Sequence, residues 1–286
     1  AIRIKPSNFK TYLLNNLDSG EVKKASFNLN IDENFKITDY KIRGSIKKID
    51  VKIINNSMIK NLSFNFIVDN NLTLINSINA NYKGVLVSNG SIDLQREEEI
   101  KINGKFNSKF DFKDKQINKL FSELKFLEEK KIETKGAILH TFDITLDKNF
   151  KIIDYNYKSN GDIFKSKVVL NNNFKNNLLE KTIKEIFFEK TKIEIKLNKK
   201  NNNLLLNGFY KFGSSNFHKF KFKNNLNKKN QNYFIDLNFA ENIFFDLINY
   251  KTTQDKVSNI RVQFSTKNKK FIIKEIDFKE SKNTIS

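Results

Sequence analysis

Apolar and polar residues alternate with a period of two along much of the chain. The alternation is clear at Ser63–Phe66, Gly104–Phe112, Lys192–Leu197 and Tyr233–Phe239, where aromatic or aliphatic residues take every second position. Successive side chains of a β-strand point to opposite faces of the sheet, so this pattern predicts strands with one apolar and one wet face. Antiparallel sheets commonly have this arrangement.

One segment of the chain is repeated. Residues 27–40 read FNLNIDENFKITDY and residues 142–155 read FDITLDKNFKIIDY, with eight of fourteen positions identical at an offset of 115. A weaker third copy lies at Phe264–Phe278. The pattern predicts a unit of roughly 115 to 120 residues. We therefore divide the chain into an entry segment with a short helix, two repeat units and the start of a third unit: 1–26, 27–141, 142–263 and 264–286.

Each copy of the repeat is interpreted as a hairpin. Alternating residues lead into an Asp-x-Asn cluster at Asp32–Asn34, and a returning strand begins at Phe35. One short acidic cluster is more often a turn than a cation site, so we expect a turn. Tight turns or bulges are also expected at four Asn-Gly pairs, two of which adjoin strand patterns. These pairs begin at Asn89, Asn103, Asn160 and Asn207.

Some segments have helical spacing instead. Apolar residues three and four apart predict helices near 114–130 and 176–190, and Pro6–Leu17 is expected to form a short helix. The stretch Glu241–Tyr250 fits either helix or strand. The predicted fold is therefore mostly β: an elongated, twisted antiparallel sheet in the form of a groove, built from the repeats, with a few short helices.

The net charge of +20 raises the question of a polyanionic ligand. Lysine alternates with apolar residues, as in Lys219–Lys223, which is the pattern of the wet side of a strand. Lys, Asn, Ile and Phe also have A/T-rich codons, so genome composition explains their excess without a ligand. The sequence therefore favours a partner other than nucleic acid.

Residues typical of active sites and metal sites are scarce. The chain has no cysteine, and His140 and His218 have no acidic partner at a recognisable spacing. Gly-rich phosphate loops and zinc-binding helices are not visible. We predict a protein that is not an enzyme, with no catalytic residue, metal or cofactor. The chain opens on Ala1 and ends soon after a strand-like run, so we expect it to be a fragment of a longer protein with an anchor or a signal peptide upstream.

The apolar face of such a sheet must be covered by a second sheet, by helices or by a ligand with acyl chains. Periodicity alone does not distinguish these three covers. The residues expected to contact the cover, and lipid in the third case, are Phe27, Leu29, Ile31, Phe64, Phe66, Phe106, Phe110, Phe112, Phe142, Ile144, Leu146, Ile193, Ile195, Leu197, Phe220, Phe222, Ile235, Leu237 and Phe239.

The chain resembles the AsmA-like family of Gram-negative bacteria, above all its YhdP-type and TamB-like members. The resemblance rests on the repeated turn Asp-x-Asn-Phe-Lys-Ile-x-Asp-Tyr at 32–40 and 147–155, and on 245–253 followed by 260–264. It implies a periplasmic β-groove anchored in the inner membrane by a segment not present here. It further implies contact with phospholipid acyl chains and with both membranes, an outer-membrane or periplasmic protein partner, and a role in outer-membrane lipid homeostasis.

Two other functions remain open from the residues. A structural or adhesive β-sandwich array would use the apolar face only as its core, between two interdigitating sheets. A nucleic-acid or polyanion binder would gather lysines into one patch with exposed aromatic rings. The arrangement of lysines and apolar residues in three dimensions distinguishes these alternatives.

Overall fold

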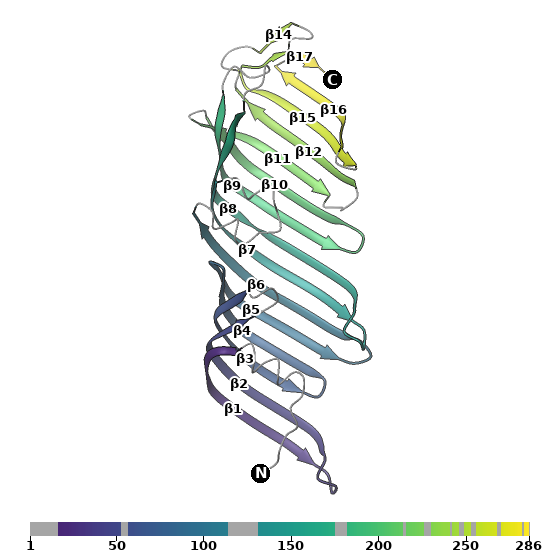
Figure 1. Ribbon diagram of the computed structural model, residues 1–286. Helices are drawn as coiled ribbons and strands as arrows, with labels where there is room; N and C mark the ends of the chain where they lie inside the picture. Colours follow the sequence, from purple (N-terminus) through teal and green to yellow (C-terminus); the bar gives the residue numbers. More distant parts are fainter. Residues whose placement is uncertain are drawn as a thin grey trace. The chain divides into compact units, whose positions relative to one another are not determined.

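Most of the residues that the structure describes lie in β-strands. The computed structural model describes residues 17–52, 57–113, 131–174, 182–213, 216–225, 230–240, 242–245, 249–252, 256–267, 270–281 and 283–285. These residues form a fifteen-stranded antiparallel sheet and a two-stranded sheet (Figure 1). The predicted mostly β, antiparallel fold is confirmed. In the part of the chain that the structure describes, no helix is long and apolar enough to cross a membrane.

The chain divides into two compact units. Unit 1 comprises Ala1–Lys109 and Leu139–Tyr155, and unit 2 comprises Phe110–Ile138 and Asn156–Ser286. The strands of unit 1, and those that both units share, are β1 (Leu17–Ile31), β2 (Ile37–Lys52), β3 (Met58–Asp69), β4 (Leu72–Tyr82), β5 (Val85–Arg96), β6 (Ile100–Phe112), β7 (Lys131–Leu146) and β8 (Ile152–Phe174). The strands of unit 2 alone are β9 (Ile183–Asn198), β10 (Asn202–Phe212), β11 (His218–Asn225), β12 (Asn230–Phe239), β13 (Phe244–Phe245), β14 (Tyr250–Lys251), β15 (Ser258–Lys267), β16 (Lys270–Glu280) and β17 (Asn283–Ile285).

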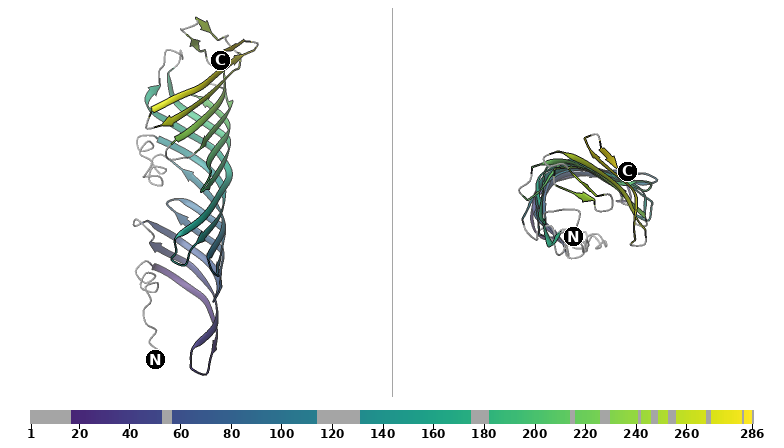
Figure 2. Two further views of the ribbon diagram at one scale, coloured as in Figure 1. Left: turned by 90° about the vertical axis from the view of Figure 1, so that its right-hand side faces the viewer. Right: turned by 90° about the horizontal axis from the view of Figure 1, so that it is seen from above.

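The strand order follows the chain. Each strand from β1 to β11 pairs with the next strand in the chain, β12 pairs with β15, and the sheet continues through β16 and β17, while β13 pairs only with β14. The order begins at β1 and ends at β17, so the sheet is open at these two edges. Figure 2 shows the green strands β9 to β12 of unit 2 side by side in one layer. The units interleave along the chain, and the repeat boundaries at 142 and 264 stay predictions.

Both copies of the repeated segment fold into the same turn, as expected. The backbone N–H of Phe35 donates to the carbonyl of Asp32, and that of Phe150 donates to the carbonyl of Asp147, at 3.0 and 2.9 Å. The Asp32 side chain accepts backbone N–H bonds from Asn34 and Lys36, at 2.9 and 2.8 Å. Asp147 accepts the equivalent bonds from the residues two and four places on, both at 2.9 Å. The acidic residue therefore bonds the turn backbone.

Strands β2 to β5 carry bulges that the alternation does not reveal. One residue in each strand has a positive φ, at Lys48, Asn61, Ser77 and Asn89, with values of 53°, 53°, 55° and 52°. The pairing register shifts beside each of them. A bulge adds one residue to a strand, so the apolar positions of β2 change from even numbers to odd numbers after Lys48.

The expected helix near 176–190 is wrong over Ile183–Lys190, which lie in β9. Ile186 and Phe187 lie three and four residues after Ile183, which fits helical spacing, but the strand places Ile186 and Phe187 on opposite faces. Short apolar runs leave helix and strand undistinguished by periodicity alone. The stretch 241–250 fitted either helix or strand from its sequence, and within it Phe244–Phe245 and Tyr250 lie in strands. The helices expected at 6–17 and 114–130 lie outside the described residues, apart from Leu17, which begins β1.

The four Asn-Gly pairs lie within strands. Asn89 is a bulge residue of β5, and Asn207 lies beside the register shift between β10 and β9. The pairs at Asn103 and Asn160 continue β6 and β8 without a turn. A Cβ added to Gly104 would lie 2.3 Å from Cζ of Phe142, so this glycine makes room for a ring on the next strand.

Candidate functional site

Apolar side chains of unit 2 line up across the strands. Paired positions form a row of Ile193, Leu206, Phe222, Ile235, Val262 and Ile276, running from β9 to β16. A second row on the same face consists of Phe220, Leu237, Ile260 and Phe278. Residues directly opposite on neighbouring strands lie about 5 Å apart, so each row is continuous. We call this side of the unit 2 sheet its apolar face.

The opposite face of unit 2 is polar. The row next to the first apolar row consists of Asp162, Lys192, Asn207, Lys221, Asp236, Arg261 and Asp277. Opposite charges lie side by side at most of its steps. Exceptions to the polarity include Phe234, whose ring lies 5.6 Å from Nζ of Lys223.

Unit 1 has the same one-sided pattern. One row of paired positions consists of Phe27, Ile42, Val68, Thr73, Leu94 and Ile102. The adjacent row on that face is Ala25, Gly44, Phe66, Ile75, Ile92 and Gly104. The other face is more mixed, because Ile67 and Leu74 lie on it among polar residues. The first two rows define the apolar face of unit 1.

All residues proposed from the sequence as facing the cover lie on the apolar face of their unit. Phe112, Phe220 and Phe239 are buried. Phe27, Leu29 and Ile31 on edge strand β1 are 62, 48 and 56 % exposed, and the others are half-buried. The strand pairing therefore brings these residues together, while their contact with lipid stays a prediction.

The described residues supply little cover for the apolar face. Those of unit 1 form a single layer of strands, so no second sheet packs on them. In unit 2 the pair β13–β14 contacts β16: the rings of Tyr250 and Phe278 are 5.9 Å apart, and the Tyr250 hydroxyl donates to Glu280 at 2.5 Å. Phe278 and Glu280 are 1 and 2 % exposed. The two interdigitating sheets of a sandwich are not found among the described residues.

A histidine and a serine form a polar pair on the apolar face of unit 1. Nε2 of His140 and Oγ of Ser108 are 2.8 Å apart and share a hydrogen bond. The imidazole stacks on Phe106, with ring centroids 4.4 Å apart. Burial lowers the pKa of His140 from its ordinary value, because the apolar surroundings disfavour the charged imidazolium.

This lowered pKa makes the stability of the fold depend on pH. Below the ordinary histidine pKa the unfolded chain binds a proton that the folded chain resists, so stability falls as pH falls through that value. The His140→Gln variant is expected to lose less melting temperature than the wild type between pH 7.5 and pH 5. His218→Gln, with the same chemical change on β11, is the control. Equal slopes for His140→Gln and the wild type would contradict the assignment.

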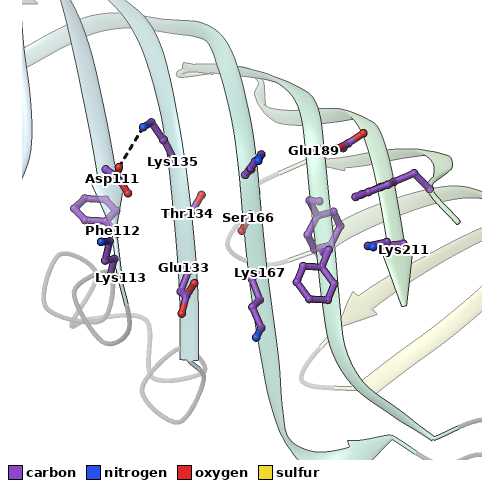
Figure 3. Close-up of a pocket in the computed structure, with 14 residues that line it drawn as sticks. Asp111, Phe112, Lys113, Glu133, Thr134, Lys135, Ser166, Lys167, Glu189 and Lys211 are labelled. Atoms are coloured by element: carbon purple, nitrogen blue, oxygen red, sulfur yellow. Dashed lines mark ion pairs between the residues drawn. The ribbon is translucent and has the colours of Figure 1, made fainter. Parts of the chain in front are cut away.

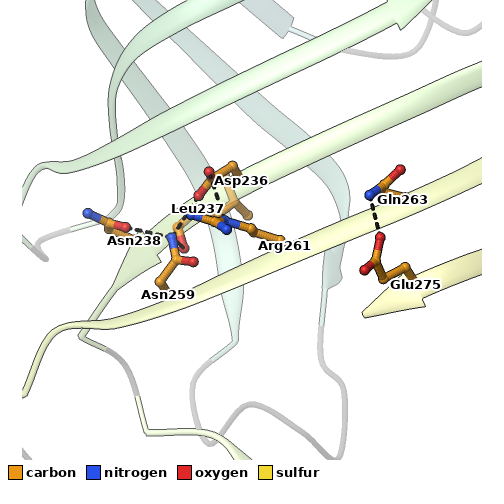
Figure 4. Close-up of polar contacts among 7 residues, drawn as sticks. All are labelled: Asp236, Leu237, Asn238, Asn259, Arg261, Gln263 and Glu275. Atoms are coloured by element: carbon orange, nitrogen blue, oxygen red, sulfur yellow. Dashed lines mark hydrogen bonds and ion pairs between the residues drawn. The ribbon is translucent and has the colours of Figure 1, made fainter. Parts of the chain in front are cut away.

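Hydrogen bonds and ion pairs hold the polar face of unit 2 together (Figure 4). The Asn259 side-chain amide donates to Asp236 at 2.7 Å and to Asn238 at 2.8 Å. Arg261 forms an ion pair with Asp236 at 3.3 Å, and Gln263 donates to Glu275. The side chains on this face therefore bond to one another across β12, β15 and β16.

A concavity of about 490 Å³ lies on the polar face of unit 2, across β6 to β10 (Figure 3). Lys135 pairs with Asp111 at 3.3 Å, and Lys167 pairs with Glu185 at 2.8 Å, which raises the pKa of Lys167. Nζ of Lys211 lies 5.5 and 5.0 Å from the rings of Phe187 and Phe217. Its lysines are thus mixed with carboxylates instead of forming a patch of one sign.

The described residues contain no group of three His, Cys, Asp or Glu side chains close enough to hold a metal ion.

The sequence interpretation missed several apolar-face residues, among them Leu204, Leu206, Ile260 and Val262. Leu204 and Leu206 belong to a run of three leucines, whose middle member lies on the polar face. Continuous apolar runs hide the period of two, and the short length of the run and the Asn-Gly pair that follows it are the remaining signals of a strand.

Comparisons of this chain with protein-family models, with curated proteins and with solved structures found no match.

Proposed function

We propose that this protein carries or shields phospholipid along the apolar faces of its sheet, without catalysing a reaction. The observation that carries the proposal is the row of six apolar side chains from Ile193 to Ile276, together with the single-layered apolar face of unit 1. Large exposed apolar surfaces on proteins are binding sites for partners, ligands or membranes.

Acyl chains suit this surface for a physical reason. Burying one methylene contributes about 0.8 kcal/mol, and the interaction has no preferred direction. Neighbouring strands are about 4.8 Å apart, so a row of apolar residues offers a similar contact at each strand. A chain sliding along the row exchanges one apolar contact for the next.

The resemblance of the repeated turns to the AsmA-like family supports a setting in the Gram-negative envelope. The proposal accordingly places the protein in the periplasm, anchored to the inner membrane through another segment, with phospholipid moving between the inner and outer membranes. Cargo on an apolar surface requires no metal or cofactor, and none is proposed.

Mass spectrometry of the chain purified without detergent tests the proposal. We expect phospholipid at about one or more molecules per protein, together with uptake of a fluorescent fatty-acyl probe by the protein after the lipid is stripped. A protein that carries no phospholipid and takes up no probe would refute the proposal and favour a structural or adhesive role.

The Lys and Phe residues of the polar concavity are the observation that favours a polyanion ligand as the second candidate. Its interspersed carboxylates argue for weak binding. A single-stranded DNA oligonucleotide is the probe for this candidate. Tight binding at 50 mM salt that weakens steeply at 200 mM would support the second candidate over the first.

A further inference from the structure

The two repeated turns share an unusual backbone feature. Phe35 has a φ of 58° and Phe150 a φ of 61°, both in the left-handed region. Each residue follows a type I turn in a three-residue hairpin loop, a position where glycine is the usual residue because it has no Cβ. A bulky residue at positive φ is a genuine outlier. The same outlier occurs at the same place in both copies.

The folded chain does not compensate for this strain by burying the rings. Phe35 is 92 % exposed and Phe150 is 73 % exposed, so neither ring is packed into the protein. Each turn is held by backbone hydrogen bonds and by the side chain of Asp32 or Asp147, which bonds the backbone, so the turns need no contribution from the phenylalanine rings. Strained residues that packing does not explain are found preferentially at functional sites.

Both rings lie on the same side of unit 1, the side formed by the turns at the ends of its strands, which we call the turn edge. The turns follow β1 and β7, and strands an even number of steps apart in an antiparallel sheet run in the same direction, so their turns share an edge (Figure 1). Six strand steps separate the hairpins, which corresponds to about 29 Å along the sheet. A folded protein partner would need two apolar pockets at that separation. A lipid bilayer accepts an apolar ring at any position.

The charges beside the rings indicate which kind of bilayer. The first turn carries Asp32, Glu33 and Lys36, and the second carries Asp147, Lys148 and Lys151. The formal charges of these two turns are −1 and +1, which sum to zero, and the β5–β6 turn between them on the same side adds Glu97, Glu98 and Glu99. Anionic headgroups are therefore not needed for attraction, and the rings themselves supply the binding energy.

We propose that Phe35 and Phe150 insert into the interfacial layer of a phospholipid bilayer and hold this edge of the sheet against the membrane. The inference goes beyond the proposed function, because it identifies a membrane-contact surface and does not require lipid on the apolar face. With both rings in one bilayer, the direction in which the strands of unit 1 stack runs along that membrane, whereas transfer between two membranes needs it to run from one to the other, so the two proposals describe different arrangements of the protein. Aromatic rings are well suited to the boundary between headgroups and acyl chains.

Cosedimentation of the full chain with phosphatidylcholine vesicles tests the proposal. The double variant Phe35→Gly and Phe150→Gly is expected to bind about tenfold or more weakly, because two buried rings are lost. Its melting temperature should stay equal or rise, since glycine fits both turns without strain. Leu86→Ser removes another apolar side chain of unit 1, which is 54 % exposed but lies within a strand, and should bind like the wild type.

Three outcomes would overturn the proposal. The double glycine variant binds as tightly as the wild type; or the wild type binds only vesicles that contain phosphatidylglycerol and is released by 0.5 M salt; or the glycine variant melts at a clearly lower temperature, which would give the rings a structural role. Phospholipid measured by mass spectrometry in the same variants reports on the apolar face separately, so a failure of either proposal is identified on its own.

Discussion

The Ile235→Asp variant is expected to copurify with about tenfold less phospholipid than the wild type, because a charge in apolar surroundings costs several kcal/mol. Ile235 lies between Phe222 and Val262 in the apolar row of unit 2. A carboxylate at this position interrupts the row and attracts water. Because Ile235 is half-buried, the folded state should lose only about 1–3 kcal/mol of stability. Lipid-to-protein ratio from mass spectrometry and a melting curve measure the two effects.

The adjacent residue offers a matched control. Phe234→Asp introduces the same acid on the same strand but on the polar face, where it would lie near Lys223. We expect this variant to retain its lipid. Equal loss of lipid in both variants, or retention in both, would show that the apolar row is not the binding surface. A charge at Phe66, Ile195 or Leu237 is expected to act as Ile235→Asp does.

The Gly161→Ala variant is expected to have the largest effect on stability. A Cβ at this position would lie 2.3 Å from the carbonyl oxygen of Ala137 and 2.6 Å from Cα of Ile138. Both atoms belong to the backbone of strand β7, which cannot rotate out of the way as a side chain can. We expect the free energy of unfolding, measured by urea denaturation, to fall by about 3 kcal/mol or more.

Gly104→Ala provides the comparison for this effect. Its added Cβ would also lie 2.3 Å from the nearest atom, but that atom is Cζ of the half-buried Phe142 ring. The ring can turn aside, so the expected loss is smaller, about 1 kcal/mol. Replacing Phe142 by leucine in the same chain should recover part of it. If Gly161→Ala proved no more costly than Gly104→Ala, the backbone contact would not be the cause.

Much of the fold could be predicted from local pattern. Alternation located most strands, because side chains on a sheet with one wet face repeat with a period of two. The turn at Asp32 was predictable because short polar side chains bond nearby backbone N–H groups. The bulges at Lys48 and Ser77 were not predictable, since neither residue is typical of a left-handed conformation. They depend on the pairing of neighbouring strands, which no single strand's pattern records.

The candidate site could be predicted only in part. Residues such as Ile193 and Phe222 were found because each lies in a regular strand. Leu206 was missed because it lies in a run of leucines, and Phe35 because a sequence does not display a positive φ or an exposed ring. Which residues face one another across strands, as Phe222 and Ile235 do, depends on pairing register, and that emerges only when the whole sheet forms.

The chain-ordered pairing of the strands has a consequence for how the protein folds and varies. From β1 to β11 every strand bonds only to its immediate neighbours in the chain, so most of the sheet contacts span short connections. Short loops close at a low entropic cost, and neighbouring hairpins can form before distant ones meet. A hairpin gained or lost by duplication or deletion would disturb only the two strands beside it, as in repeat proteins whose stability is a sum over neighbouring units.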